Sequence, residues 1–291
     1  MRAVPVIRAA TADDLDAVLE LLQERDRAVF GDVATQRRWL EHDLAQAAYD
    51  CLVAHDDGRV VGWATLDGAR DLTVAATAEP IAEELLAQVE ASARRRRFDS
   101  LTSIAVPEDA VLWPLLERSG FTRSREILRM WRTLDGELPV PAWPAGVTVR
   151  LYTDEDGQRV HALLDAVYAG WDPDYAELTH DDWLAFMTDH EEFDPELWFL
   201  VERDGVLVAC ALHWRAGDAK GWVKDIVVHE NERGRGLGRA LLEHGFREYR
   251  ARGVDRVGLK VDVNNPTGAI RLYERVGFAV DRRYVVWEKA L

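Results

Sequence analysis

The chain of 291 residues is long for one average domain and sufficient for two domains that each bury a core. With 48% hydrophobic and 30% charged residues it reads as a soluble globular protein, and no apolar run is long enough to span a membrane. The formal net charge of −16 disfavours general nucleic-acid binding, because neutralising phosphate groups requires a basic surface.

The N-terminus lacks the long apolar segment of a secretory signal, so a cytoplasmic location is expected. Only two cysteines occur, Cys51 and Cys210, and both lie in or beside apolar, strand-like runs. We therefore expect buried free thiols, with no disulfide and no metal site.

The first half alternates short strands and helices. Thr11 and the acids after it provide a helix N-cap, Asp57-Gly58 predicts a hairpin turn, and Pro80 fits the first position of a helix. Strands are expected over 6–8, 51–54, 60–64, 72–75 and 103–106 and near residue 134, and helices after residue 14 and over 36–48, 80–97 and 111–118.

The pattern then restarts after a segment containing three prolines. Thr153 matches the cap at Thr11, a second hairpin turn follows at Asp204-Gly205, and residues 115–121 align with 272–278. This long-period duplication predicts two tandem domains. Their expected bounds are 1–135 and 147–291, joined by a linker over 136–146.

The second copy contains a strand, a glycine-rich loop and a helix in succession. Residues 223–228 predict the strand, glycines alternate with other residues over 234–238, and an apolar-periodic helix begins near Ala240. Such a loop binds phosphate through its backbone N–H groups and the helix N-terminus. The loop lacks the Gly-Lys-Ser/Thr ending of a P-loop and the spacing of a dinucleotide fingerprint.

This loop and a later motif resemble the GNAT (GCN5-related) N-acetyltransferase family. The first motif is Arg233-x-x-Gly236-x-Gly238, and the second is Asn265 followed by Leu272-Tyr273-x-x-x-Gly277-Phe278. The resemblance implies an α/β (α+β) fold of two tandem domains, each a mixed, mostly antiparallel twisted sheet flanked by helices. It also implies acetyl-CoA as cosubstrate and direct attack on it by a primary amine of a small molecule.

The resemblance assigns roles to particular residues. The fourth and fifth strands would splay apart to admit the pantetheine arm, Tyr273 would be the general acid, and Asn265 or Asn264 would bind the arm. Asn265 also fits a plain helix N-cap before Pro266. The expected contacts of acetyl-CoA are Ile226, Val227 and Val228 on the strand, and Arg233, Gly234, Arg235, Gly236, Leu237, Gly238 and Arg239 in the loop.

The general base is less clearly marked. The family's common glutamate positions fall on Trp222 and Lys260, neither of which suits this role. Asp225 is the nearest acid on the strand, although strand alternation would turn it away from the cleft. His213, His229 and a water relay to a distant carboxylate are the alternatives.

The two copies differ at these positions. Where the second copy has its loop, the first has residues 75–80 without glycine or arginine, and Leu116 replaces Tyr273. The first copy is therefore expected to be degenerate and non-catalytic, retained as structural support or as a wall of the substrate cleft.

Acids and aromatics in the second copy's early helices either form a rim for a cationic amine or make up a solvated helix face over buried aromatics. These residues are Tyr168, Trp171, Asp172, Asp174, Tyr175, Asp181, Asp182, Trp183, Asp189, His190, Glu191 and Glu192.

Three alternatives concern the substrate and the activity. Tandem architecture and a faint echo at Leu212-His213-Trp214 resemble mycothiol synthases and imply acetylation of an amino thiol, although Trp222 stands where that family has an acid. Acetylation of peptide or protein amines would use the same site. A non-catalytic acyl-CoA-binding module is the third alternative, and oligomeric state is left open.

Overall fold

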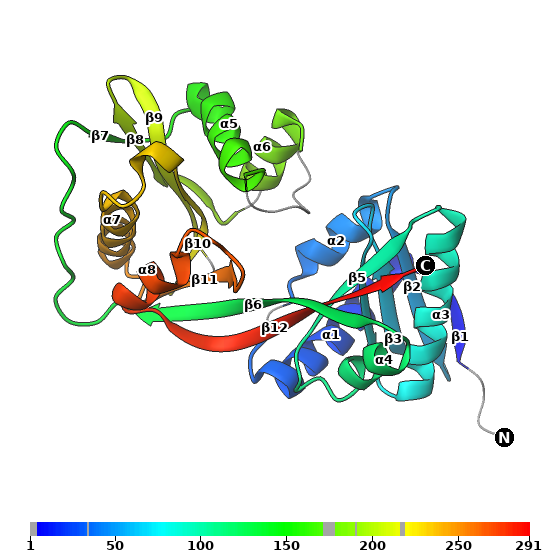
Figure 1. Cartoon of the computed structure of the whole chain (residues 1–291). Helices are drawn as coiled ribbons and strands as arrows, with labels where there is room; N and C mark the ends of the chain where they lie inside the picture. Colours follow the sequence, from blue (N-terminus) through cyan, green and yellow to red (C-terminus); the bar gives the residue numbers. More distant parts are fainter. Residues whose placement is uncertain (1–4, 34, 171–177, 190, 216–218) are drawn as a thin grey trace. The chain divides into compact units, whose positions relative to one another are not determined.

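A computed structural model describes residues 5–33, 35–170, 178–189, 191–215 and 219–291. The chain forms two compact units, the first made of 1–126 with 284–291, and the second of 127–283 (Figure 1). In the described part of the chain, no helix is long and apolar enough to cross a membrane. Cys51 and Cys210 are both free thiols, and burial raises the pKa of Cys51 to about 12.

The first unit is a sheet with helices on both faces. Its strand order is β1-β2-β3-β4-β5-β12, antiparallel except for the parallel pair β4–β5. One cluster of buried side chains lies under α3 and α4, and another lies under α1 and α2. The elements are β1 (Val6–Ala9), η1 (Ala12–Asp14), α1 (Leu15–Phe30), α2 (Arg37–Ala45), β2 (Asp50–Asp56), β3 (Arg59–Leu66), β4 (Asp71–Ala76), α3 (Glu79–Arg95), β5 (Ser100–Ala105) and α4 (Leu112–Arg118).

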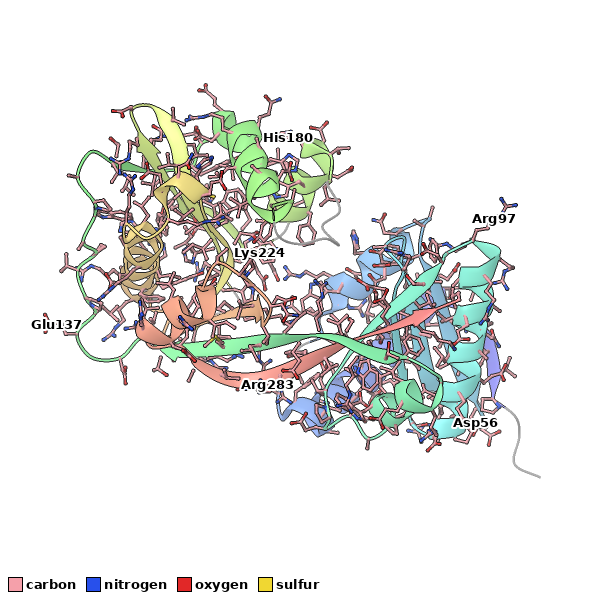
Figure 2. The ribbon with its side chains drawn as sticks, in the orientation of Figure 1. Asp56, Arg97, Glu137, His180, Lys224 and Arg283 are labelled. Carbon is pink, nitrogen blue, oxygen red and sulfur yellow. The ribbon has the colours of Figure 1, made fainter. Side chains whose placement is uncertain are left out.

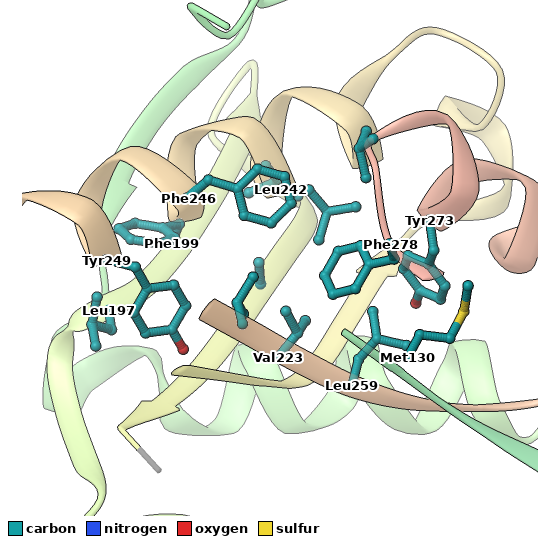
Figure 3. Packing of buried hydrophobic residues seen from close by; sticks show 14 of the residues in the cluster. Met130, Leu197, Phe199, Val223, Leu242, Phe246, Tyr249, Leu259, Tyr273 and Phe278 are labelled. Atoms are coloured by element: carbon teal, nitrogen blue, oxygen red, sulfur yellow. The ribbon is translucent and has the colours of Figure 1, made fainter. Parts of the chain in front are cut away.

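The second unit repeats this plan. Its strand order is β6-β11-β10-β9-β8-β7, with β10–β11 the parallel pair. The helix α7 covers one face over a large apolar cluster (Figure 3), and α5 and α6 cover the other. The elements are β6 (Thr122–Thr133), β7 (Thr148–Leu151), η2 (Asp154–Asp156), α5 (Gly157–Tyr168), α6 (His180–Thr188), β8 (Phe193–Arg203), β9 (Val206–Arg215), β10 (Lys220–Val228), η3 (Glu230–Glu232), α7 (Leu237–Ala251), β11 (Arg256–Asp262), α8 (Ala269–Arg275) and β12 (Ala279–Ala290).

The last strand of each repeat pairs within the other unit. Residues 127–133 of β6 pair with β11, and residues 285–290 of β12 pair with β5. The units therefore do not follow the expected bounds 1–135 and 147–291, since the chain passes between units inside β6 and again inside β12. Strand periodicity shows which face of a strand is buried but not which neighbour it joins, so the sequence pattern contains no sign of this exchange.

The duplication extends to side-chain geometry. Arg8 bonds the carboxylate of Asp14 at 2.7 Å, and Arg150 bonds that of Asp156 at 2.6 Å, each beside a capping box at Thr11 or Thr153. These arginine hydrogen bonds hold the pKa values of both carboxyl groups well below their usual range. Equivalent start-of-helix geometry in both units confirms the repeat that the sequence predicted.

Candidate active site

The strands β10 and β11 separate along their length. They pair at only three positions, the last joining Trp222 and Gly258, although β10 continues to Val228 and β11 to Asp262. Beyond Trp222, the edge of β10 that faces β11 therefore has backbone N–H and C=O groups without strand partners. This is the splay that the family resemblance implies.

A cavity of about 610 Å³ lies at this divergence. It is lined by α5, β10, the glycine loop, β11 and the segment leading into α8. Of the site residues that the sequence nominated, the structure places Tyr273, Asp225, Ile226, Val227, Val228, Arg233, Gly234, Gly236, Leu237, Gly238, Arg239 and Asn265 in its wall. Of the site residues predicted from the sequence, Arg235 does not line the cavity.

The glycine loop leads into the N-terminus of α7. Gly234 and Gly236 have φ of 75° and 90°, a left-handed conformation that glycine adopts without strain. At Gly238 a Cβ atom would lie 3.0 Å from the Leu272 side chain, so a larger residue would crowd the segment opposite. Among the described residues, the amide N–H groups of 234–239 donate no backbone hydrogen bond, which leaves them available to an anion.

The arginines of the loop have partners within the protein, so they are less available to a bound anion than the sequence indicates. Arg239 bonds the buried carboxylate of Glu243 at 2.7 Å, and Arg235 lies 3.7 Å from Glu232. Arg233 instead donates to the carbonyl of Val228 at 3.1 Å and so ties the loop to the end of β10. The backbone N–H groups and the dipole of α7 are therefore the main anion-binding features here.

A β-bulge turns Asp225 toward α5. The register of β10 against β9 shifts between Val223 and Asp225. Val223 consequently packs on the α7 side and Val227 on the α5 side, whereas residues four apart in a regular strand share one face. The expectation that alternation turns Asp225 away from the cleft is therefore wrong, because the extra residue reverses the alternation.

The Asp225 carboxylate has two close neighbours. The Tyr168 hydroxyl donates to Oδ1 at 2.6 Å, and Lys224 Nζ lies 3.5 Å from Oδ2. Burial, followed by the charge of Asp225, raises the pKa of Tyr168 well above its usual value. Tyr168 thus keeps its proton and acts here as a donor.

Tyr273 projects from α8 into the same cavity. Its side chain packs edge-on against Phe278 with the ring centroids 5.8 Å apart (Figure 3). Burial, together with the charge of Asp225, raises its pKa above the usual value. The phenol remains protonated at neutral pH and can donate its proton.

Asn265 does not cap a helix. The helix α8 begins at Ala269 with Gly268 as its N-cap. The prediction of an N-cap at Asn265, with Pro266 in the first helical position, is therefore wrong. The Asn265 side-chain oxygen instead accepts the N–H of Thr267 at 2.9 Å, an Asx turn that competes with helix formation. Asn265 lines the cavity, whereas Asn264 is not part of its wall.

The alternative base positions have other surroundings. Trp222 packs edge-on against Trp131 at 5.7 Å and covers Gly258, where a Cβ atom would lie 2.7 Å from its ring. His213 is fully buried against α7, away from the cavity, and burial lowers its pKa to about 3. Lys260 lines the cavity, and burial with the charge of Arg129 lowers its pKa.

His229 also lies outside the cavity wall and accepts the N–H of Asn231 at the start of η3. Of the expected acid and aromatic rim, Tyr168 reaches the cavity, but Trp183 is a buried anchor packed on His161 at 5.0 Å. The members at 171–175 and at 190 lie outside the described residues. Tyr168 was expected only as one member of that rim, and no pattern in the sequence indicated that its hydroxyl would reach Asp225.

An ion pair lies in the first unit at the place that corresponds to the cavity of the second. Counting from the caps at Thr11 and Thr153, Arg25 of α1 corresponds to Val167, which lines the cavity of the second unit. Arg25 forms a salt bridge of 2.6 Å to Asp109, which also caps the first turn of α4. The half-buried Arg25 and the buried Asp109 therefore join α1 to the loop before α4.

Comparison with known proteins agrees with this geometry. The Acetyltransferase (GNAT) family model matches residues 158–278. The mycothiol acetyltransferase of Kineococcus radiotolerans is 34% identical over 91% of this chain and 89% of its own length. That of Streptomyces coelicolor is 29% identical over 95% of this chain and 92% of its own.

Two solved structures share the fold. A GCN5-related N-acetyltransferase from Sphaerobacter thermophilus superposes with a TM-score of 0.80 at 27% identity, covering 98% of this chain and 95% of its own. A tandem GNAT protein from the clavulanic acid biosynthesis pathway gives 0.73 at 22% identity, covering 99% and 98%. The expected fold class is confirmed, and the chain belongs to the GNAT family as an enzyme that transfers acetyl groups.

Proposed function

We propose that this enzyme transfers the acetyl group of acetyl-CoA directly to a primary amine of a small molecule, in the cavity of the second unit. The observation that carries the proposal is the loss of pairing between β10 and β11 inside a cavity that also holds the glycine loop and Tyr273. The edge of β10 that faces β11 beyond Trp222 fits a pantetheine arm, and the amides of 234–239 fit a pyrophosphate. Asn265 offers its side-chain amide N–H groups to the arm.

The residues around the cavity supply the proton chemistry. When bound, acetyl-CoA supplies a thioester whose carbonyl carbon accepts the amine. A backbone N–H of β10 stabilises the developing oxyanion, and Asp225 accepts the proton that the amine loses. Tyr273 donates a proton to the thiolate leaving group, since its phenol is protonated at neutral pH.

The first unit is the degenerate copy in this proposal. Its counterpart of Tyr273 is Leu116, and the Arg25–Asp109 pair spans the place of the ligand. Displacing that pair would leave a charge without a partner in a buried setting, which is costly. We therefore expect one acetyl-CoA site in each chain.

A second candidate function is acetylation of an amino thiol, as in the mycothiol acetyltransferases. Relatives of that name align with this chain over nearly its whole length, which favours this acceptor. The indole of Trp222 at the position of that family's acid is the feature against it. Turnover with an amino thiol and with the same amine lacking the thiol separates this candidate from a general small-amine acetyltransferase.

Calorimetric titration with acetyl-CoA tests the cofactor assignment. One site per chain is expected in the wild type, and Gly236→Asp should abolish binding because a carboxylate at a φ of 90° opposes the pyrophosphate. Gly205→Asp is the matched control, since Gly205 has a φ of 78° in a hairpin turn outside the cavity. Binding that survives Gly236→Asp, or two sites per chain, would contradict the assignment.

Acceptor identity requires a separate assay. Release of the CoA thiol would be followed with a panel of small primary amines, amino thiols and peptides with free N-termini. Turnover with small amines and not with peptides is the expected result. Preference for peptides would favour an N-terminal acetyltransferase instead.

A further inference from the structure

The Tyr168–Asp225 hydrogen bond joins α5 to β10, where the bulge turns Asp225 toward α5. Tyr168 is the last residue of α5, and its hydroxyl donates to Asp225 Oδ1 at 2.6 Å. Both side chains line the cavity, and both are largely buried. A short hydrogen bond to a carboxylate in such a setting fixes the orientation of that carboxylate.

We propose that Tyr168 is a positioning residue that holds Asp225 with its second oxygen directed at the acceptor amine. This inference rests on the proposed function, in which Asp225 accepts the proton of the amine. Because Oδ1 is occupied by the phenol, Oδ2 is the oxygen left to act as base. Toward a carboxylate, which only accepts, a protonated phenol is the donor, so Tyr168 orients the base without competing for the proton.

The charged and titratable groups around Asp225 are consistent with this role. Lys224, labelled in Figure 2, lies 3.5 Å from Oδ2, which is longer than a good N–H···O hydrogen bond. Its ammonium is also held over the rings of Phe186 and Trp214, at 5.4 and 5.5 Å from their centroids. The charge of Asp225 also acts on the Tyr273 phenol from α8 and on the Cys210 thiol from β9, and it raises the pKa of both groups beyond the effect of their burial.

In the proposed reaction, the acetyl group moves from the thioester sulfur to the amine nitrogen. The amine nitrogen forms a bond to the thioester carbonyl carbon and gives one proton to Asp225 Oδ2. The carbon–sulfur bond breaks, and the departing sulfur takes the proton of the Tyr273 hydroxyl. Tyr273 regains a proton from water and Asp225 returns one, so the products are the amide and the free thiol.

A double-mutant cycle tests whether Tyr168 acts through Asp225. We expect kcat to fall by about 10- to 100-fold in Tyr168→Phe and further in Asp225→Asn, with little change in KM for acetyl-CoA. The double variant should be no slower than Asp225→Asn alone.

Tyr249→Phe is the control for loss of a buried phenol. The Tyr249 hydroxyl bonds the backbone at Trp222 and Trp214 and lies outside the cavity wall. Its effect should add to that of Asp225→Asn. Additive losses in kcat for Tyr168→Phe and Asp225→Asn, or a loss in Tyr168→Phe that falls on the KM of acetyl-CoA instead of kcat, would overturn the positioning role.

The proposed function can fail independently of this inference. If the wild type acetylates no amine in the panel, the function fails, and the same cycle is then measured by thermal unfolding. Losses in Tm that are smaller in the double variant than the sum of the single losses support the coupling. Additive losses in Tm overturn it, because the Tyr168–Asp225 hydrogen bond would then not couple the two side chains.

Discussion

Tyr273 and Leu116 occupy equivalent positions in the two repeats, and this single difference concerns chemistry rather than packing. Both side chains are buried, so an apolar residue suffices for the fold at this place. Tyr273→Phe should therefore keep acetyl-CoA affinity within about twofold while kcat falls by about 100-fold or more, the usual contribution of a general acid. Parallel calorimetry and steady-state kinetics would measure both, and a wild-type kcat would exclude Tyr273 as the acid.

His213 is a residue whose environment links stability to pH. Both ring nitrogens are buried and have no hydrogen-bond partner among the described residues, and burial lowers the pKa to about 3, below the value of about 6.5 expected in the unfolded chain. Since the unfolded state alone gains a proton, the free energy of unfolding is unaffected above pH 6.5 and falls as the pH drops below it. The expected loss is about 2 kcal/mol at pH 5.

Denaturant unfolding at pH 7.5 and pH 5 of the wild type and of His213→Leu would measure this term. The variant should lose about 2 kcal/mol less than the wild type between the two conditions. His42→Leu, which replaces an exposed imidazole on α2, is the control and should behave like the wild type. Equal losses in the wild type and His213→Leu would show that His213 does not carry the pH dependence.

At the scale of elements, α6 presents an exposed aromatic side chain to the charged end of the site. Phe186 is 56% exposed, and its ring lies 5.9 Å from Trp214 and 5.4 Å from Lys224 Nζ. An acceptor ammonium bound at Asp225 would approach the same rings. Phe186→Ala should therefore raise the KM of the amine about 3- to 30-fold, the range of a cation–π contact.

The KM of acetyl-CoA should not change in Phe186→Ala, because Phe186 is not part of the cavity wall. Trp39→Ala is the matched control, since Trp39 is an exposed aromatic residue on a helix of the first unit and is 48% exposed. An unchanged amine KM in Phe186→Ala would place the acceptor elsewhere.

The elements differ in how far the sequence predicted them. The hairpin turns, the capped helices and the glycine loop followed from local patterns, because each depends on a few adjacent residues such as Asp204-Gly205. The bulge at Lys224 did not follow from the local pattern. The alternation of buried and exposed residues along a strand does not show where one extra residue is inserted. The orientation of Asp225, and with it the role inferred for Tyr168, depended on that bulge.

At the scale of the whole molecule, the duplication was visible in the sequence but the exchange of strands was not. The aligned segments 115–121 and 272–278 showed two copies, and the natural inference was that each copy closes its own sheet. In the structure β6 completes the sheet of the second unit and β12 that of the first. Pairing between strands distant in the chain is decided by the fold as a whole, so local patterning cannot assign it.

The exchange makes a prediction about fragments of the chain. Residues 147–291 contain every nominated site residue, but they lack β6 and leave β11 as an unpaired edge beside the cavity. Residues 122–283 retain β6 against β11 and omit the part of β12 that pairs with β5. We expect the second fragment to fold and bind acetyl-CoA, and the first to aggregate through its open edge.

Circular dichroism, size-exclusion chromatography and calorimetry on the two fragments would measure this difference. The fragments differ at both ends: the first lacks residues 122–146, which include β6, and the second lacks residues 284–291 at the end of the chain. If residues 147–291 bound acetyl-CoA as the full chain does, β6 would be dispensable to the site. The structural division at residues 126 and 283 would then not be the functional one.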